Sequence, residues 1–255
     1  MRGRLARGVS GGGDHGLPHG PRSQAQPLRR VGIDALTREG LAALEREVVS
    51  CRHCPRLVEW RERVAREKRA AYAQETYWGR PLPGFGDPQA GIVVFGLAPA
   101  AHGANRTGRF FTGDRSGDFL FAALHRAGLS ETAVSRTVED EANLRGLWIT
   151  AAVRCAPPQN RPTPAERDAC LPYAARELGL LNARVLVCLG AFAWDAALRL
   201  LEIRPKPKFG HGAEVASGDL VLLGCYHPSQ QNTFTGVLKP EMLDAVLLRA
   251  KELSG

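Results

Sequence analysis

Short apolar runs recur along the chain and alternate with longer stretches of helical spacing. Four of these runs are nearly continuous in apolar residues and lie at 91–96, 147–153, 184–189 and 219–225. Continuous runs of this length are typical of parallel strands that are covered on both faces. The pattern therefore predicts an α/β fold, namely a three-layer sandwich around a central, mostly parallel four-stranded sheet.

Stretches with helical spacing separate the runs and follow the last one. They lie at 117–127, 163–177, 191–201 and 240–251. Two more helices are expected before the first run. One covers 37–49, where Leu41, Leu44 and Val48 share a face, and the other follows Pro55 and carries charges of both signs. Such a charged stretch indicates a solvent-exposed face.

The composition changes near residue 30. Residues 1–30 contain six arginines against one acid, Asp14, and they are rich in glycine. Because so few large apolar side chains cannot offset the entropy of ordering, we expect a disordered basic tail. The remaining residues, 31–255, are enough for one domain with a full core. The tail supplies most of the net charge of +8, so the charge gives only weak support for a nucleic-acid partner.

The sequence gives no sign of a membrane segment. It contains no apolar stretch of the roughly eighteen residues that cross a bilayer, and no secretory apolar region follows Met1. We therefore expect a cytoplasmic protein, in a compartment where structural disulfides are uncommon and thiols stay free to bind metals.

Four of the six cysteines lie in polar segments, at Cys51, Cys54, Cys155 and Cys170. Four accessible thiolates suit either a tetrahedral zinc ion or an iron–sulfur cluster. An isolated C-x-x-C has other uses, so a redox pair beside two unrelated cysteines is an alternative. The other two cysteines, Cys188 and Cys225, lie inside apolar runs and are predicted to be buried core thiols.

Ligands of parallel sheets bind beyond the carboxyl ends of the strands. Three loops that follow predicted strands, at 96–114, 154–162 and 225–236, are the segments richest in Gly, Pro, Asn, His and Thr. They should meet at one edge of the sheet and form an active site. The loop at 96–114 contains neither G-x-G-x-x-G nor a P-loop lysine, which disfavours nucleotide-phosphate binding of those types there.

Two features of these loops suit recognition of a flat ring. Phe110 and Phe111 could pack in the core, but paired aromatics in a Gly-rich polar loop also suit stacking. His227 could be a structural histidine. At a strand end, and followed by the rigid Pro228, it could instead donate a hydrogen bond to a developing negative charge.

The motifs of these segments resemble one family. They read Y-W-G-R-P-L-P-G-F-G-D-P, G-L-A-P-A-A-H-G-A-N-R-T-G-R-F-F-T-G-D, C-A-P-P-Q-N-R-P-T-P-A-E and H-P-S-Q-Q-N-T-F-T-G. In this order and with this cysteine spacing, the chain resembles the family 5 uracil-DNA glycosylases over about residues 48–252. The resemblance implies a base-excision-repair enzyme that hydrolyses the N-glycosidic bond of uracil in DNA. It also implies that the catalytic domain is 31–255, and that the four cysteines of the polar segments ligate a [4Fe–4S] cluster.

The resemblance carries roles onto individual residues. Phe111 matches the position that stacks on the base, and His227 matches the histidine that donates to the pyrimidine oxygen. Most of the superfamily has Asp, Glu or Asn where this chain has Ala98, and a methyl group cannot position water. We therefore expect Asn160 to hold the water, with Asp114 as a helper.

A second departure concerns Ala151, where the uracil-specific families tend to have an asparagine that reads the pyrimidine edge. Losing that side chain should widen the range of substrates to hypoxanthine and xanthine. The expected partner is double-stranded DNA with deaminated bases, and single-stranded DNA is a further expected substrate. We expect a monomer that works at the nucleoid of a bacterial cell.

The loop at 229–236 has the length to enter a groove and fill the gap left by an extruded nucleotide. The residues predicted to contact DNA are Ser229 and the candidate wedges Gln231 and Phe234, with Arg106, Arg109 and Arg161 for phosphates. Phosphate contacts would make the affinity fall as salt is added.

Two other classes of protein compete with this interpretation. A non-enzymatic zinc module that binds nucleic acid would explain the four cysteines and the basic tail. It would not explain why Asn160, His227 and Phe111 meet at strand ends. A thiol redox protein would use Cys51 and Cys54 and would need neither of the other two thiols.

Overall fold

Six strands form a single sheet in the computed structural model, which describes residues 28–140 and 142–255. Their bounds are β1 (Phe85–Gly86), β2 (Ile92–Gly96), β3 (Leu147–Ala151), β4 (Val185–Leu189), β5 (Glu214–Ser217) and β6 (Leu220–Cys225). The order across the sheet is β1-β3-β2-β4-β6-β5. The four apolar runs form the four central strands, which are mutually parallel. The prediction of four strands was incomplete, because β1 and β5 add antiparallel edges.

Helices cover both faces of this sheet. They are α1 (Leu28–Ser50), α2 (Pro55–Glu67), α3 (Ala104–Thr107), α4 (Arg115–Arg126), α5 (Pro164–Leu180), α6 (Ala191–Leu200), α7 (Gln230–Phe234) and α8 (Pro240–Ser254), with 3-10 turns η1 (Ala70–Tyr72) and η2 (Pro158–Asn160). The first helix begins earlier than predicted, so residues 28–30 of the expected tail belong to α1. Residues 1–27 of that tail lie outside the described residues. Across the described ranges, no helix is both long and apolar enough to pass through a bilayer.

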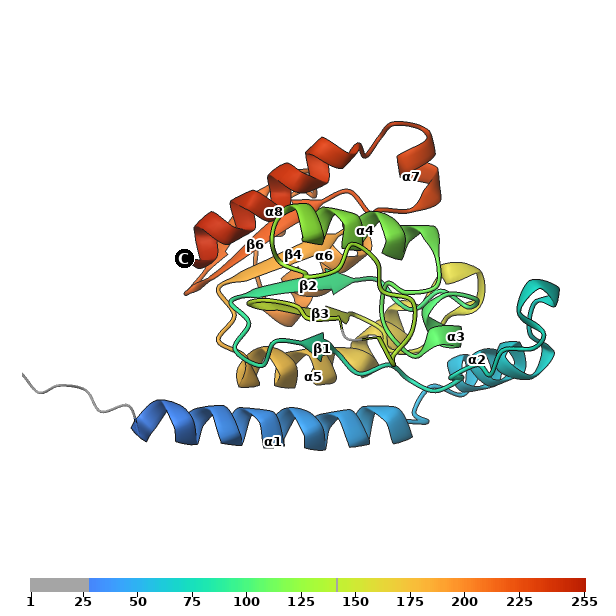
Figure 1. Ribbon diagram of the computed structural model, residues 1–255. Helices are drawn as coiled ribbons and strands as arrows, with labels where there is room; N and C mark the ends of the chain where they lie inside the picture. The colour runs from blue at the N-terminus through green and yellow to red at the C-terminus, as the bar shows by residue number, and fades with distance from the viewer. Residues whose placement is uncertain (1–27, 141) are drawn as a thin grey trace, which may run out of the picture.

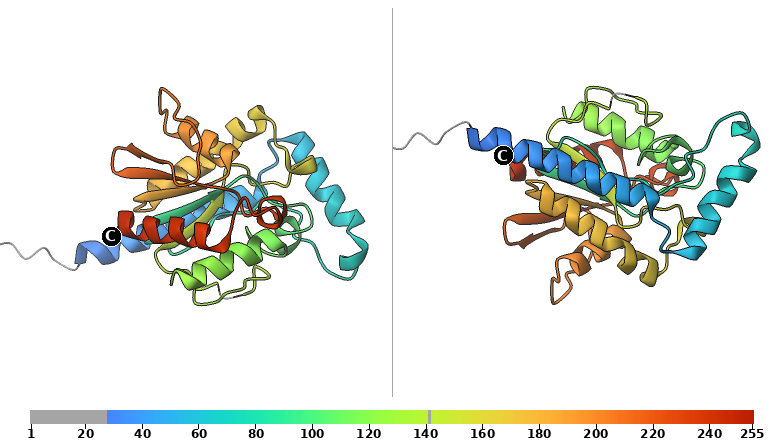
Figure 2. Two further views of the ribbon diagram at one scale, coloured as in Figure 1. Left: turned by 90° about the horizontal axis from the view of Figure 1, so that it is seen from above. Right: turned by 90° about the horizontal axis from the view of Figure 1, so that it is seen from below.

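The strands bury alternate residues against two separate helical layers. Val94 and Ile149 face a core formed with α4 and α8, whereas Val93 and Phe95 face a core formed with α1, α5 and α6. Figure 1 shows α4 and α8 above the sheet and α1 and α5 below it, and the two views of Figure 2 show these layers from outside. The three-layer α/β sandwich is therefore confirmed.

A buried ion pair fastens α5 to the sheet. Arg154, just after β3, donates two hydrogen bonds of 2.9 and 2.6 Å to the carboxylate of Glu177 on α5. The same carboxylate accepts from the hydroxyl of Thr150 at 2.7 Å and from the amide of Gly84 at 3.0 Å. Both charged residues are at most 2% exposed. Such a pair is costly to break, because either partner alone would be an uncompensated charge in the interior.

We expect Glu177→Gln to lower the free energy of unfolding by about 3–5 kcal/mol, since it leaves the Arg154 guanidinium buried without a counter-charge. Glu47→Gln is the matched control, because it removes a carboxylate from a half-exposed pair with Arg176. That change should cost less than about 1 kcal/mol. Urea unfolding measures both, and equal losses in the two variants would contradict the role given to the buried pair.

Candidate active site and cysteine cluster

The loops after β2, β3 and β6 line one pocket of about 770 Å³ at the carboxyl end of the sheet. Its walls include Ala98, Phe111 and Asp114 from the first loop, Asn160 from the second and His227 from the third. The structure thus brings together the residues predicted to bind the base and to hold the water. Ala151, the last residue of β3, lies buried in the same wall.

Phe111 owes its position to an unusual backbone and to a missing side chain. Its φ of 56° lies in the left-handed region, which is rare for a bulky residue. The ring lies against Gly96 at the end of β2, where an added Cβ would come within 2.9 Å of the ring atom Cζ. Its centroid is 6.2 Å from that of His227, with a tilt of 35° between the planes. One aromatic face and one imidazole therefore border the same space.

His227 lies at the end of the segment that leaves β6. Burial lowers the pKa of its imidazole to about 4. The ring is therefore neutral at physiological pH and keeps one N–H that can donate. The side chain of Asn232 donates to the carbonyl of His227 at 2.9 Å, which fixes the backbone that carries the ring.

Asn160 projects from a turn of strained backbone. Both Gln159 and Asn160 have positive φ, at 55° and 56°, in the short η2 turn. Asparagine tolerates this region better than most residues, because its short polar side chain can hydrogen-bond locally. Asn160 is exposed and lines the pocket, so its amide is accessible to water there.

Asp114 is the sole acidic residue among the described residues that line the pocket. It caps α4, because its Oδ1 accepts from the amide of Gly117 at 3.0 Å. The other carboxylate oxygen packs against Gly103, where a Cβ would come within 2.4 Å of it. Burial raises the pKa of this carboxyl. Ala98, by contrast, presents only a methyl group to the pocket.

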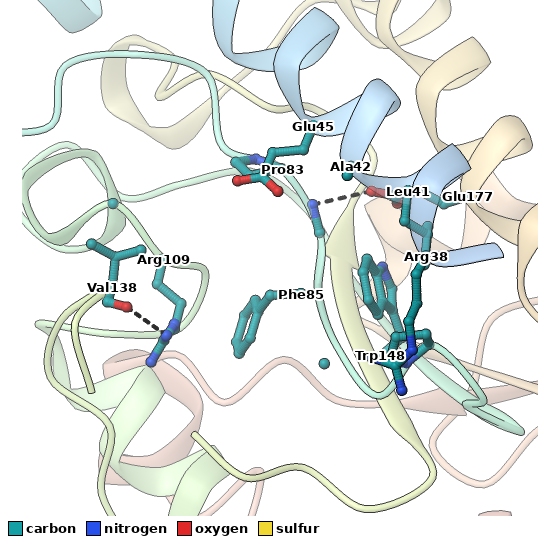
Figure 3. A pocket seen from close by; sticks show the side chains of 14 residues that line it. Arg38, Leu41, Ala42, Glu45, Pro83, Phe85, Arg109, Val138, Trp148 and Glu177 are labelled. Carbon is teal, nitrogen blue, oxygen red and sulfur yellow. Dashed lines mark hydrogen bonds between the residues drawn. The ribbon is translucent and has the colours of Figure 1, made fainter. Parts of the chain in front are cut away.

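Two of the arginines predicted to bind phosphate are occupied elsewhere. Arg109 lines a different pocket of about 420 Å³ between α1 and β1, and Figure 3 shows it on the side away from α1. Its guanidinium donates to the carbonyls of Val138 and Asp140, both at 2.7 Å. Arg109 is therefore not placed for DNA at the candidate active site, contrary to the prediction. Arg106 is only 11% exposed and donates to the carbonyls of His102 and Gly113 and to Glu75.

The remaining predicted contacts lie beside the pocket. Arg161 is exposed next to Asn160, and Gln231 lines the pocket. The segment at 229–236 is not an open loop as predicted, because residues 230–234 form α7, which Ser229 caps. Phe234 on this helix is 67% exposed, and the guanidinium of Arg115 lies 5.1 Å from its ring centroid.

Several pocket residues were not found from the sequence. Arg69, Tyr72, His102 and Arg115 all line the same pocket. The stretch after Pro55 reads as one continuous charged helix, which hides the fact that α2 ends at Glu67. His102 lies within the motif loop at 96–114, and Arg115 follows that loop directly. This position in the sequence could have indicated that both line the pocket.

The four cysteines of the polar segments line one small cavity. Cys51 and Cys54 come from the connection between α1 and α2, Cys155 from the loop after β3, and Cys170 from α5. The other two are fully buried in the core, as predicted. A single ion needs its thiolate ligands about 2.3 Å from one point. Among the described residues, no three His, Cys, Asp or Glu side chains are grouped so as to hold one ion.

Two buried arginines flank this cavity. Arg61 is 2% exposed and donates to the sulfur of Cys155 at 2.9 Å, and the backbone amide of Arg154 donates to the sulfur of Cys170 at 3.3 Å. The Nε atoms of both arginines are buried without a protein partner. Burial raises the pKa of the Cys155 thiol to about 11 and that of Cys170 to about 12. Metal ligation would remove these protons.

Comparisons with known proteins agree with this geometry. A sequence model of the uracil DNA glycosylase superfamily matches residues 83–251. The type-5 uracil-DNA glycosylase of Mycobacterium tuberculosis is 58% identical over 80% of this chain and 78% of its own length. That of Mycobacterium leprae is 54% identical over 83% and 95%, and that of Thermus thermophilus is 52% identical over 84% and 98%. The chain belongs to the type-5 family of uracil-DNA glycosylases.

The low pKa of His227 gives a testable pH dependence. We expect its ring resonances to show no titration between pH 8 and pH 5 and to shift only near pH 4, and His227→Gln assigns them by NMR. The unfolded histidine has a pKa of about 6.5, so acidification from pH 6.5 to pH 4 favours the unfolded state, by up to about 1.4 kcal/mol per pH unit. His227→Gln should lose less stability over this range. A midpoint near pH 6.5 for His227 would contradict the neutral donor.

Proposed function

We propose that the protein hydrolyses the N-glycosidic bond of uracil, and of the deaminated purines hypoxanthine and xanthine, in DNA. Membership of the type-5 family supports uracil as a substrate. The observation that carries the chemical proposal is the pairing of Phe111 with a neutral His227 in one pocket at the strand ends.

Excision requires that the nucleotide leave the stacked duplex and enter the pocket. Phe111 would stack on the base, and the neutral His227 would donate to the exocyclic oxygen on which negative charge develops. The imidazole is already neutral and desolvated. It can therefore stabilise the anionic leaving group by a hydrogen bond while it stays neutral itself. Water then adds to the sugar carbon as the bond to the base breaks, and the base leaves with the bonding electron pair. The proton that the added water loses passes to solvent, from which the departed base anion takes up a proton.

Water must be positioned without a carboxylate at Ala98. The side-chain oxygen of Asn160 can accept a hydrogen bond from water, but it is not an effective base. Asp114 is the remaining acid of the pocket, and its Oδ1 is engaged as the cap of α4. We infer that Asn160 orients the water, that Asp114 assists, and that most of the rate enhancement comes from stabilising the leaving base.

The wall at Ala151 supports a broad substrate range. This residue is 1% exposed and presents a methyl group where a polar side chain would read the edge of a pyrimidine. A methyl group neither selects nor rejects a hydrogen-bonding pattern, and the pocket of about 770 Å³ has space for a purine. Hypoxanthine and xanthine, like uracil, carry an exocyclic carbonyl oxygen that can accept a hydrogen bond from an N–H such as that of His227.

We propose further that the four cysteines hold a [4Fe–4S] cluster. The support is that four thiols from three separate segments share one cavity, flanked by two buried arginines whose Nε atoms have no protein partner. A thiolate cluster carries negative charge, which the guanidinium of Arg61 would compensate. When bound, the cluster would link the α1–α2 connection, the loop after β3 and α5.

The alternative of a non-enzymatic zinc module has less support. A zinc ion would account only for the four cysteines that share the small cavity. A zinc module would also not explain why Phe111, Asn160 and His227 line one pocket. A redox role for Cys51 and Cys54 alone would not explain why Cys155 and Cys170 share their cavity.

Replacing one ligand should remove the cluster. We expect Cys155→Ser to lose iron, visible absorbance and soluble yield, because three thiolates remain for a four-cornered cluster. Cys188→Ser is the matched control, since it also changes a buried cysteine, in β4, and should keep the iron content of the parent. Iron and sulfide analysis of the purified proteins measures both. Full iron content in Cys155→Ser would refute the ligand assignment.

Asn160→Ala tests the water assignment. Loss of one water ligand should slow single-turnover excision of uracil by roughly 10²- to 10³-fold, while DNA binding changes much less. Arg184→Gln, at the opposite end of the sheet, is the control and should keep the parental rate. An Asn160→Ala enzyme that cleaves at the parental rate would exclude this role.

The same assay tests the substrate range when the oligonucleotide carries hypoxanthine or xanthine. The parent should excise all three bases, and Ala151→Asn should disfavour the purines relative to uracil. Excision strictly limited to uracil would refute the interpretation of the pocket, and an absence of all excision would refute the proposed function.

A further inference from the structure

The segment after α2 forms a part of the pocket lining that contains none of the proposed catalytic residues. The helix stops at Glu67 because Lys68 turns into the left-handed region, with φ of 56°. Arg69 and Tyr72 follow, and both line the pocket that contains Asn160 and His227. Figure 1 shows this segment beyond α2, at the same end of the sheet as α7.

The ring of Tyr72 packs against Arg106, which is held by backbone carbonyls of the pocket lining. The guanidinium of Arg106 lies 4.0 Å from the centroid of the Tyr72 ring. Arg106 in turn donates to the carbonyl of His102 at 2.9 Å and to that of Gly113 at 3.1 Å, and it pairs with Glu75. The occupied guanidinium of Arg106 therefore supports an aromatic ring in the lining of the pocket.

The α7 side of the pocket has a comparable arrangement. Phe234 is 67% exposed, and the guanidinium of Arg115, a residue of the pocket wall, lies 5.1 Å from its ring. Aromatic rings backed by arginines therefore occur on both the α7 segment and the segment after α2. Phe234 is exposed and Tyr72 is half-buried. An accessible aromatic face suits stacking with bases of any sequence, since every base has a π face.

The charge near Tyr72 is positive. Arg69 is exposed, and no carboxylate of the described residues forms an ion pair with it. Burial lowers the pKa of His102, and the charges of Arg69 and Arg106 lower it further. The field that disfavours a proton on His102 attracts an anion to the same part of the pocket lining, and the phosphates of the DNA strand are such anions.

We propose that Tyr72 and Arg69 form a second DNA-binding site, which takes the nucleotide next to the extruded one on the same strand. Tyr72 stacks on the base of that nucleotide, and Arg69 pairs with its phosphate. The strand next to the extruded nucleotide must pass the part of the pocket lining that meets solvent, and Tyr72 is a half-buried residue of that lining. This inference rests on the proposed function, because it assumes that a nucleotide is extruded into the pocket.

Binding to an uncleaved substrate isolates this contact from catalysis. The probes are oligonucleotides with one 2′-fluoro-2′-deoxyuridine, whose glycosidic bond resists hydrolysis, in single-stranded and duplex form. The variants are Tyr72→Ala and Tyr72→Phe, which differ in the ring, and Arg69→Gln and Arg66→Gln, which remove the same charge. Arg66 is exposed on α2 and does not line the pocket. Thermal unfolding establishes that each variant is folded.

Tyr72→Ala should weaken binding by about 5- to 100-fold on both probes, which is the usual range for one lost base stack, and Tyr72→Phe should stay within about twofold of the parent. Arg69→Gln should reduce the slope of log Kd against log salt by about 0.7 on the single strand and about 0.9 on the duplex. Arg66→Gln should leave the slope unchanged.

Parental affinity in a folded Tyr72→Ala would overturn the proposal. A loss confined to the duplex probe would overturn it as well, because the contact would then be to the opposite strand. Equal salt slopes for Arg69→Gln and Arg66→Gln would refute the proposed contact between Arg69 and a phosphate. Failure of the parent to excise uracil would instead refute the proposed function, so the two failures are distinguishable.

Discussion

The buried charge of Arg154 constrains the half of the molecule that carries both candidate sites. Its side chain bonds Glu177 of α5, its amide bonds the sulfur of Cys170, and its carbonyl accepts from the amide of Leu82. Arg154 thus connects the end of β3, the cysteine cavity and the loop that precedes β1. Because the candidate active site begins three residues earlier, at the end of β3, a shift of Arg154 would disturb the pocket and the cavity together.

The candidate active site is preorganised by backbone that most residues avoid. Phe111, Gln159 and Asn160 all have positive φ, in two loops that face the same pocket. Such conformations cost of order 1–3 kcal/mol each and persist only where the surroundings enforce them. Here the Asp114 cap on α4 anchors the chain just beyond Phe111, and Arg56 of α2 donates to the carbonyl of Arg161, next to Asn160, at 3.2 Å. The pocket can therefore present an aromatic ring and an amide without rearranging when a base enters.

The central strands were predictable because parallel strands covered on both faces must be continuously apolar. β1 was not predictable, since a strand of two residues is too short to show a hydrophobic pattern. β5 was not predictable either, since its four residues are all at least partly exposed. The pocket residues followed from their motifs, as did the shared cavity of the cysteines. The role of Arg109 did not, because its partners are the carbonyls of Val138 and Asp140, which are distant in sequence. Tyr72 was not predicted, because nothing in this charged stretch marks the positive φ of Lys68, at which α2 ends.

The spread of the four thiols along the chain imposes an order on biosynthesis. Cys51 and Cys54 leave the ribosome first, before any strand of the sheet exists, whereas Cys170 follows only when β1, β2 and β3 have been made. A group that needs all four thiolates cannot be fully ligated on the nascent chain until α5 has been synthesised as far as Cys170. In the interval the early C-x-x-C pair is a free dithiol, open to oxidation or to the wrong metal. For the proposed [4Fe–4S] cluster, delivery of iron and sulfide would therefore be a late step, which follows synthesis of β1, β2 and β3.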